Sequence, residues 1–436
     1  MLFLFAALAV NFATGLPSDN CAANYVLLLT GIPASTTTPN SAEAYYVIFV
    51  IALACCLPGC VVCGRYPRPA NFRQLACDLA ALVFLIVWVY GLLLGWVLGN
   101  SLSFVIRNFA GMLFYIAYFI LVCLRAPPEK VYKVTYWAAL YVMLLTIVLS
   151  IAAELLNIDI DSPAWAFFSG PVRAGEASGH RRIFCANQLV LFVVASIALY
   201  RLTSLYFRRL LKSLLLAAIA LYALFVPASR GYILGLIAII AVLLMAAAAP
   251  LMRLRVSKRF LALLLFIALG AGVVIATGYD DIVLLIFSQE EGGNAIRLEQ
   301  SSVLLDDCTL FGRGLGAVIS SGYTRVSGLD YAFEVVYVNI FHKFGIFAVL
   351  LIACYLYTFY AAGKALVRKT IPAEHACCAL GAMGYTLVAF GNPVLFAPSG
   401  VLLHCVALYL LRQPSSRVAQ LDNPAVGRVA WEARGV

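Results

Sequence analysis

The sequence contains few charged residues: 11% of its 436 residues are Asp, Glu, Lys or Arg, whereas 64% are hydrophobic. Its mean hydropathy is +0.97. A soluble globule needs a charged surface, so this composition excludes that class of protein. Apolar segments of about 20 residues, enough to cross a hydrocarbon layer of about 30 Å, recur along the chain. The sequence therefore predicts an all-α polytopic membrane protein.

The chain also lacks linkers and internal repeats, which predicts a single membrane domain over residues 1–436 and gives no sign of a repeat-built transporter. We predict about twelve transmembrane helices. The N-terminal segment has no basic residue and no clear cleavage site, which favours a first span over a signal peptide. The predicted spans are 1–16, 45–63, 75–98, 102–123, 135–156, 184–200, 213–228, 232–251, 260–278, 335–363, 375–391 and 398–411.

Lysine and arginine are distributed unevenly over the predicted connections. About 21 of the 30 basic residues fall in alternate connections and in the tail 412–436, which predicts that these parts and both termini are cytosolic. The net charge of +10 is then explained by this distribution and by lipid headgroups, without a nucleic-acid partner. Two long segments, 157–183 and 279–334, are predicted to lie on the opposite, periplasmic side, and loops of that length are usually functional or disordered.

Metal-binding patterns are scarce. No group of carboxylates has the spacing of a metal site, and Cys60-x-x-Cys63 lacks the second pair that a zinc site needs. We therefore predict neither a metal nor another cofactor. Cys21 and Cys308 both fall on the predicted periplasmic side, and the sequence leaves open whether they form a disulfide.

Arg230 lies in a turn with almost no polar length between two predicted spans, Pro227-Ala228-Ser229-Arg230-Gly231. Its guanidinium is therefore expected at the membrane surface, where holding a charge without a partner is costly. A phosphate ligand explains such an arginine, and a side chain that reaches lipid headgroups is the alternative.

Arg297 lies in residues 294–310, where the apolar residues predict an amphipathic helix along the membrane face. The segment around it is acidic, so Arg313 is predicted either to bind phosphate or to form an ion pair. Gly312, Gly314 and Gly316 form either an anion-binding turn or simply a tight turn. The apolar residues of the predicted helix are Ile296, Val303, Leu304 and Leu310.

Four sequence motifs occur in order in the middle and C-terminal half. They are Arg181-Arg182-Ile-Phe-Cys-Ala-Asn187-Gln188-Leu before the sixth span; Ser229-Arg230-Gly231; Arg297-Leu-Glu with the later Leu-Phe-Gly312-Arg-Gly314-Leu-Gly316; and Glu334-Val-Val-Tyr-Val-Asn-Ile-Phe-His-Lys-Phe-Gly345. In these motifs and in their order along the chain, the sequence resembles the O-antigen ligase and polysaccharide polymerase superfamily. The resemblance implies a GT-C-like membrane glycosyltransferase with a long periplasmic loop that contains amphipathic helices.

The resemblance also implies a function: transfer of a growing glycan from undecaprenyl pyrophosphate to the next lipid-linked repeat unit, with inversion and without metal. Ligases of this family usually carry His-Asn where this chain has Glu334-Val335, which favours a polymerase. The implied partners are an undecaprenyl-pyrophosphate-linked oligosaccharide, membrane lipids, a chain-length regulator and a flippase. The implied location is a bacterial inner membrane, with the active site facing the periplasm.

The chemistry of such a reaction assigns the candidate residues. Negative charge grows on the leaving diphosphate, so Arg230 and Arg297, helped by Arg181 or Arg182, are the predicted electrophiles. Glu334 is predicted to deprotonate or orient the attacking hydroxyl, and a surface ion pair is its alternative role. His342 is predicted to be a buried or interfacial residue, not the base.

Two other functions stay open at this point. One is a ligase that passes the glycan to lipid A core or to a protein. The other is a transporter or flippase of an anionic solute, in which the arginines would line a pathway instead of a one-sided site.

Overall fold

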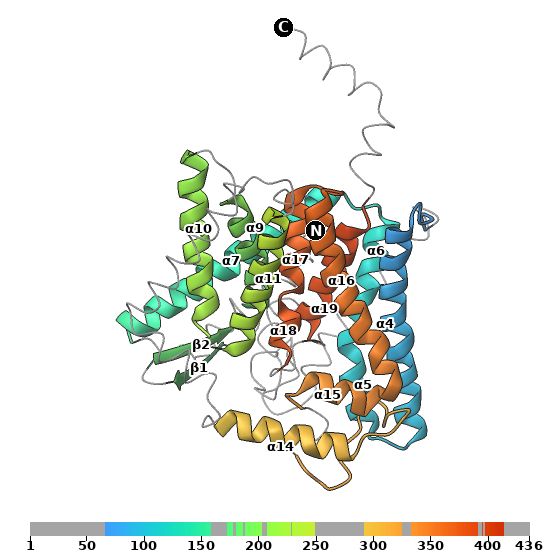
Figure 1. Cartoon of the computed structure of the whole chain (residues 1–436). Helices are drawn as coiled ribbons and strands as arrows, with labels where there is room; N and C mark the ends of the chain where they lie inside the picture. Colours follow the sequence, from blue (N-terminus) through green and yellow to red (C-terminus); the bar gives the residue numbers. More distant parts are fainter. Residues whose placement is uncertain are drawn as a thin grey trace, which may run out of the picture.

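The computed structural model describes residues 66–157, 172–177, 180–185, 188–202, 207–227, 229–248, 292–324, 333–390, 395 and 397–413. Within these ranges the chain is a helical bundle with one pair of antiparallel strands (Figure 1). The predicted spans 1–16, 45–63 and 260–278 and the Cys60–Cys63 motif lie outside the described residues, as does Cys21.

Five helical segments in the described part of the chain are long and apolar enough to cross a membrane. This confirms a multi-pass membrane protein, whereas the predicted number of twelve spans is not established. The five are α4 (Phe72–Val97); α5 (Leu102–Ala110) with η1 (Gly111–Tyr115) and α6 (Ile116–Cys123); α7 (Pro128–Leu155); α11 (Arg230–Ala248); and α15 (Val336–Phe344) with η4 (Gly345–Phe347) and α16 (Ala348–Arg368).

Shorter apolar helices form the centre of the bundle, where α9 and α19 are buried on all sides. Small residues let them pack closely: a Cβ on Gly381 would lie 2.5 Å from the carbonyl oxygen of Phe192. The Ser196 hydroxyl also donates to the Cys377 carbonyl at 2.7 Å, which joins α9 to α17. The remaining helices are η2 (Gln188–Val190), α9 (Leu191–Arg201), α10 (Phe207–Phe225), α14 (Gly292–Asp306), α17 (Ala373–Met383), α18 (Tyr385–Val388) and α19 (Pro398–Leu411).

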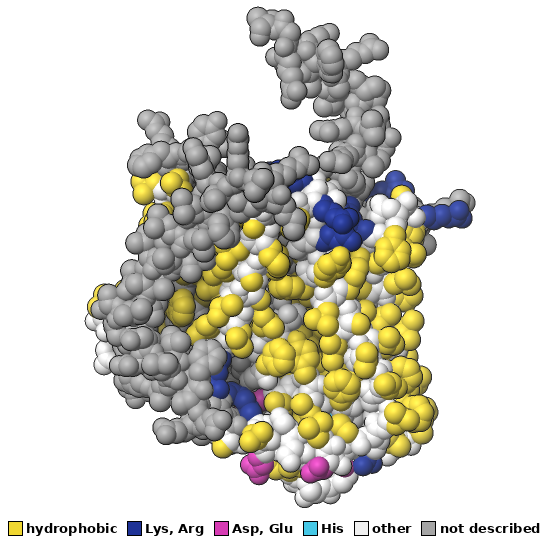
Figure 2. Space-filling view, in the orientation of Figure 1, with side chains coloured by type: hydrophobic (Ala, Val, Ile, Leu, Met, Phe, Trp, Pro, Cys, Tyr) yellow, Lys and Arg dark blue, Asp and Glu magenta, His cyan; other side chains and the backbone are white. Residues whose placement is uncertain are grey.

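The outer helices expose apolar side chains along one face. On α4 the buried residues include Cys77, Ala81, Phe84 and Trp88, and the opposite face is exposed. Such a face is stable against lipid and unfavourable in water, so it marks the membrane-facing side (Figure 2). The exposed residues of α4 include Leu75, Leu79, Leu82, Ile86, Val89 and Leu93.

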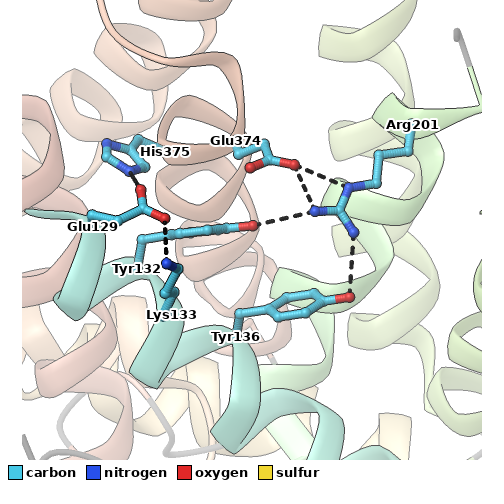
Figure 3. Close-up of polar contacts among 7 residues, drawn as sticks. All are labelled: Glu129, Tyr132, Lys133, Tyr136, Arg201, Glu374 and His375. Carbon is cyan, nitrogen blue, oxygen red and sulfur yellow. Dashed lines mark hydrogen bonds and ion pairs between the residues drawn. The ribbon is translucent and has the colours of Figure 1, made fainter.

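Basic residues of the predicted cytosolic connections lie together at one end of the bundle. Arg201 pairs with Glu374 at 2.5 Å and donates to the hydroxyls of Tyr132 and Tyr136, which ties α9 to α17 and α7 (Figure 3). At the same end, Arg73 donates to Thr370 at 2.8 Å, and Arg412 pairs with Asp78 at 2.7 Å. The structure thus groups Arg73, Arg201 and Arg412 at one end of the bundle, and the cytosolic location of that end stays a prediction.

Two features differ from the predicted all-α bundle of continuous spans. Residues Val172–Ala177 and His180–Cys185 form an antiparallel hairpin, β1 and β2, in which Val172 pairs with Cys185. The sequence signal for it is the Ser178-Gly179 dipeptide between two short segments, because Ser-Gly is a common turn or loop dipeptide. In addition, the predicted spans 102–123, 335–363 and 375–391 are each built from more than one helix. Gly345, at φ +53°, ends α15.

The glycine-rich segment passes between α4, α5 and α15. Gly312, Gly314 and Gly316 have φ values of +83°, +76° and +72°, which favour glycine. They also lie against backbone: a Cβ on Gly314 would be 2.2 Å from the Gly95 nitrogen. The segment is therefore fixed both by its conformation and by close packing.

Gly314→Ala should lower the free energy of unfolding by about 1–3 kcal/mol more than Gly322→Ala does, because of overpacking against α4. Gly322 is a matched control, since its φ is +77° but nothing lies within 4 Å of the position of its Cβ. Both variants place a residue with a Cβ in the left-handed backbone region, which costs each of them about 1–2 kcal/mol. Thermal unfolding of the detergent-solubilised protein measures the difference, and equal midpoints would contradict the packing argument.

Candidate functional site

The predicted periplasmic site residues that the structure describes lie at the end of the bundle opposite the basic network. The starts of α11 and α15, the hairpin and α14 all come together at this end (Figure 1). In the space-filling view, Lys or Arg side chains gather just above α14, close to Asp or Glu side chains (Figure 2). The described part of this end is therefore of mixed charge.

Helix α14 confirms the helix that was predicted over 294–310, although it ends at Asp306. Arg297, Gln300, Leu304 and Asp307 follow one another at intervals of three, four and three residues, which places them on one face at about 100° per residue. Leu304 packs in a small cluster with Phe333 and other apolar residues. The prediction for Leu310 is wrong, because it follows the helix and is exposed.

Arg297 and Glu334 are in contact. The guanidinium Nε of Arg297 lies 3.3 Å from Glu334 Oε2, and the two side chains are 32% and 27% exposed. The Arg297 N–H does not point along the contact, so this is an ion pair without a well-aligned hydrogen bond. The structure thus joins two of the predicted site residues, and the contact also fits the alternative reading of Glu334 as a surface ion-pair partner.

Arg230 is the first residue of α11 and is half-buried, in the short turn that the sequence predicts. Gly231 next to it packs on α18, where a Cβ would lie 2.6 Å from the Cα of Val388. On the same short helix, the Thr386 carbonyl accepts a hydrogen bond from the Tyr337 hydroxyl at 2.6 Å. Helix α18 therefore connects the start of α11 to the helix that follows Glu334.

Arg181 and Arg182 lie on β2, opposite Glu176 and Gly175. Arg182 is half-buried, and the side chain of Arg181 is outside the described part of the structure. The N–H of Ile183 donates to the Val226 carbonyl at 3.4 Å, in the turn before α11. The hairpin is thereby attached close to Arg230.

Arg313 has the ion-pair partner that the alternative reading predicted. Its Nη2 lies 3.0 Å from Asp307 Oδ1, and its Nε donates to the Asp307 carbonyl at 3.1 Å. This contact fits the alternative of an ion pair, and the pyrophosphate contact predicted for Arg313 stays a prediction.

The anion-binding role predicted for the 312–316 turn does not agree with its hydrogen bonds. Every N–H of the turn donates within the protein, to acceptors on α4, α5, α15 and the preceding turn. An anion would have to break these bonds, so the glycines serve as a tight turn, which was the alternative reading. The acceptors, in order from residue 312, are the carbonyls of Thr309, His342, Lys343 and Gly91 and the side-chain oxygen of Asn108.

His342 is fully buried, as the sequence predicted, and its Nε2 lies 2.8 Å from Asp307 Oδ2. Next to it, Lys343 is buried and donates to Asn108. Ser320 completes the surroundings of Asp307 with a hydrogen bond at 2.6 Å. Cys308 is a free thiol in this structure.

Two residues that hold this site together were not singled out from the sequence. Asp307 is one of many acidic residues in its segment, and Gln300 is an ordinary helix residue. The spacing of Gln300 and Asp307 from Arg297 is the sequence signal that could have identified them. A polar side chain on the apolar face of an amphipathic helix is expected to need a hydrogen-bond partner within the protein.

No protein-family model matches the chain, and no curated protein shows significant sequence similarity to it.

Asp307→Asn should lower the free energy of unfolding near pH 7 by about 1–3 kcal/mol, because charge-assisted hydrogen bonds are lost. Burial raises the pKa of Asp307, but hydrogen bonds from Ser320 and His342 and the charge of Arg313 bring that pKa below its usual value. A lowered pKa stabilises the fold above the unfolded-state value, about 3.9, and that contribution is lost as pH falls through the folded-state pKa.

Thermal unfolding midpoints from pH 3 to pH 7 (about the range in which carboxylates titrate) measure this effect. Asp306→Asn is the matched control, because Asp306 is the exposed neighbour with the same charge. The difference in thermal midpoint between the Asp307→Asn variant and the wild type should become smaller as the pH is lowered. A difference in midpoint that does not change with pH, or that is equal for Asp307→Asn and Asp306→Asn, would contradict the stabilising role of the Asp307 carboxylate.

Proposed function

We propose that this protein is a polysaccharide polymerase that transfers a growing glycan from undecaprenyl pyrophosphate to the next lipid-linked repeat unit. The observation that carries the proposal is the contact between Arg297 and Glu334, a cation and a carboxylate, both partly exposed. Strand β2 with Arg182 and the starts of α11 and α15, which carry or follow Arg230 and Glu334, lie at the same end of the bundle as α14 (Figure 1), which supports a one-sided site. The proposed location is a bacterial inner membrane with this end in the periplasm.

In the proposed reaction, a hydroxyl oxygen of the acceptor sugar attacks the anomeric carbon of the donor glycan. The bond from that carbon to the diphosphate oxygen breaks, and the hydroxyl proton passes to Glu334. The leaving undecaprenyl diphosphate gains negative charge, which Arg297 and Arg230 stabilise, with Arg182 close by. These steps require no metal ion, because the guanidinium groups supply the positive charge.

The Arg297–Glu334 pair belongs to the donor-free protein in this proposal. A diphosphate carries more negative charge than one carboxylate and presents several acceptor oxygens to a guanidinium. Its arrival would draw Arg297 toward the donor and release Glu334 to accept a proton. Chain-length regulation and flipping of the repeat unit would fall to partner proteins.

A ligase acting on lipid A core or protein and a transporter of an anionic solute are the competing functions. The carboxylate at 334, where ligases of the resembled family carry histidine, favours a polymerase. Purified protein incubated with undecaprenyl-pyrophosphate-linked repeat units alone distinguishes the three. A ladder of lengths indicates a polymerase, transfer that needs an added acceptor indicates a ligase, and unchanged lipid indicates transport.

Charge reversal separates a catalytic pair from a structural one. Arg297→Glu and Glu334→Arg should each lower the elongation rate by at least about 100-fold, since removing one transition-state contact costs about that much. The double variant should restore thermal stability but not elongation, because the cation and the base would have exchanged places.

The same reversal at Arg201 and Glu374 is the control, because this ion pair lies at the opposite end of the bundle. That double variant should keep its elongation rate. Elongation by the Arg297→Glu, Glu334→Arg protein at a wild-type rate would show that the pair is structural and would remove it from the mechanism.

A further inference from the structure

Gln300 connects α14 to the backbone of Glu334. Its side-chain Oε1 accepts a hydrogen bond from the Glu334 N–H at 3.1 Å, one helical turn along α14 from Arg297. The Gln300 side chain is fully buried. One helix therefore holds Glu334 twice, by its carboxylate through Arg297 and by its backbone through Gln300.

The orientation of the Gln300 amide follows from this bond, because a backbone N–H requires an acceptor and only Oε1 is one. The amide Nε2 is then buried without a hydrogen-bond partner in the described part of the chain. A buried unsatisfied donor is destabilising, and an apolar side chain of similar length would avoid that cost. The hydrogen bond from the Glu334 N–H is therefore what the Gln300 amide provides and an apolar side chain would not.

The surroundings of Glu334 make its backbone position important. Residue 334 precedes α15 and is not part of that helix, whose first residue is Val336. On one side, Phe333 and Val335 pack with Leu304 of α14. The carboxylate therefore projects from a short non-helical segment that contacts α14 through Gln300 and Leu304.

We propose that Gln300 is a positioning residue for the transfer reaction: by holding the Glu334 backbone, it places the carboxylate opposite Arg297, where the acceptor hydroxyl must lose its proton. This inference rests on the proposed function and adds a residue to it. Gln300 acts through Glu334 and need not touch the substrate. Its loss should therefore affect turnover more than donor binding.

Two substitutions test the proposal on the purified protein with undecaprenyl-pyrophosphate-linked repeat units. Gln300→Met keeps length and helix propensity but removes both the acceptor and the unpartnered donor. It should leave the thermal midpoint unchanged or raised, lower kcat about tenfold and leave KM for the donor nearly unchanged.

Gln300→Glu keeps an acceptor oxygen for the Glu334 N–H but adds a second carboxylate next to Glu334. Arg297 faces the Glu334 carboxylate, whereas His342 and Lys343 of α15 face Asp307 and Asn108. The replacement keeps the contact that holds the Glu334 backbone, so kcat should stay closer to the wild-type value than it does in Gln300→Met, again with KM for the donor nearly unchanged.

Gln74 provides the matched control at the opposite end of the bundle. It is also buried, and its Oε1 accepts the Ala70 N–H at 2.7 Å. Gln74→Met and Gln74→Glu should leave kcat of the folded protein unchanged. Equal losses at both positions, a wild-type kcat in Gln300→Met, or a kcat in Gln300→Glu no higher than that of Gln300→Met would each overturn the inference. Wild-type protein that elongates no donor would instead refute the proposed function, and this inference with it.

Discussion

The arrangement of the end of the bundle that carries α14 depends on one buried carboxylate, Asp307. It accepts hydrogen bonds from Ser320, Arg313 and His342, so it joins the end of α14, the segment after it and α15 at a single point. A carboxylate in a poorly solvated place is stable only when its oxygens are satisfied, and three donors satisfy it here. Asp307 directly follows α14 and continues the face of the helix that carries Arg297, so its three contacts also fix the orientation of Arg297.

The glycine turn extends this constraint to the membrane-spanning helices. Its N–H groups donate to carbonyls of α15 and α4, and the side chain of Asn100 donates to the Arg313 and Leu315 carbonyls at 2.9 Å. The absence of side chains at Gly312, Gly314 and Gly316 allows these contacts. The loop that carries the candidate site is consequently attached to the rigid bundle on several sides, which is the support that a precisely placed pair of charged groups needs.

The sequence predicted the membrane class and drew attention to Arg297 and Glu334, which the structure brings into contact, because hydropathy and motif order are properties of the chain itself. The roles of these two residues stay predictions. The sequence could not predict which carboxylate Arg297 and Arg313 each contact. Arg313 and Arg297 lie in the same acidic segment, and only the fold places Asp307 next to one and Glu334 next to the other. The hairpin was missed because its strands lie in a loop with little alternation, and Gln300 because its partner is a backbone N–H.

The exposure of the Arg297–Glu334 pair decides what it is able to do. A fully buried ion pair is costly to break, by about 3–5 kcal/mol, because one charge is left without a partner. A pair that is about one-third exposed is worth at most about 1 kcal/mol, since water and salt compensate both charges when they part. The interaction of Arg297 with a diphosphate, which has several oxygens that bind a guanidinium, would be stronger than its interaction with Glu334. The pair therefore keeps the arginine and the carboxylate close together without preventing either from acting on a substrate. Asp307 and His342, which are both buried, are by contrast suited to staying in place.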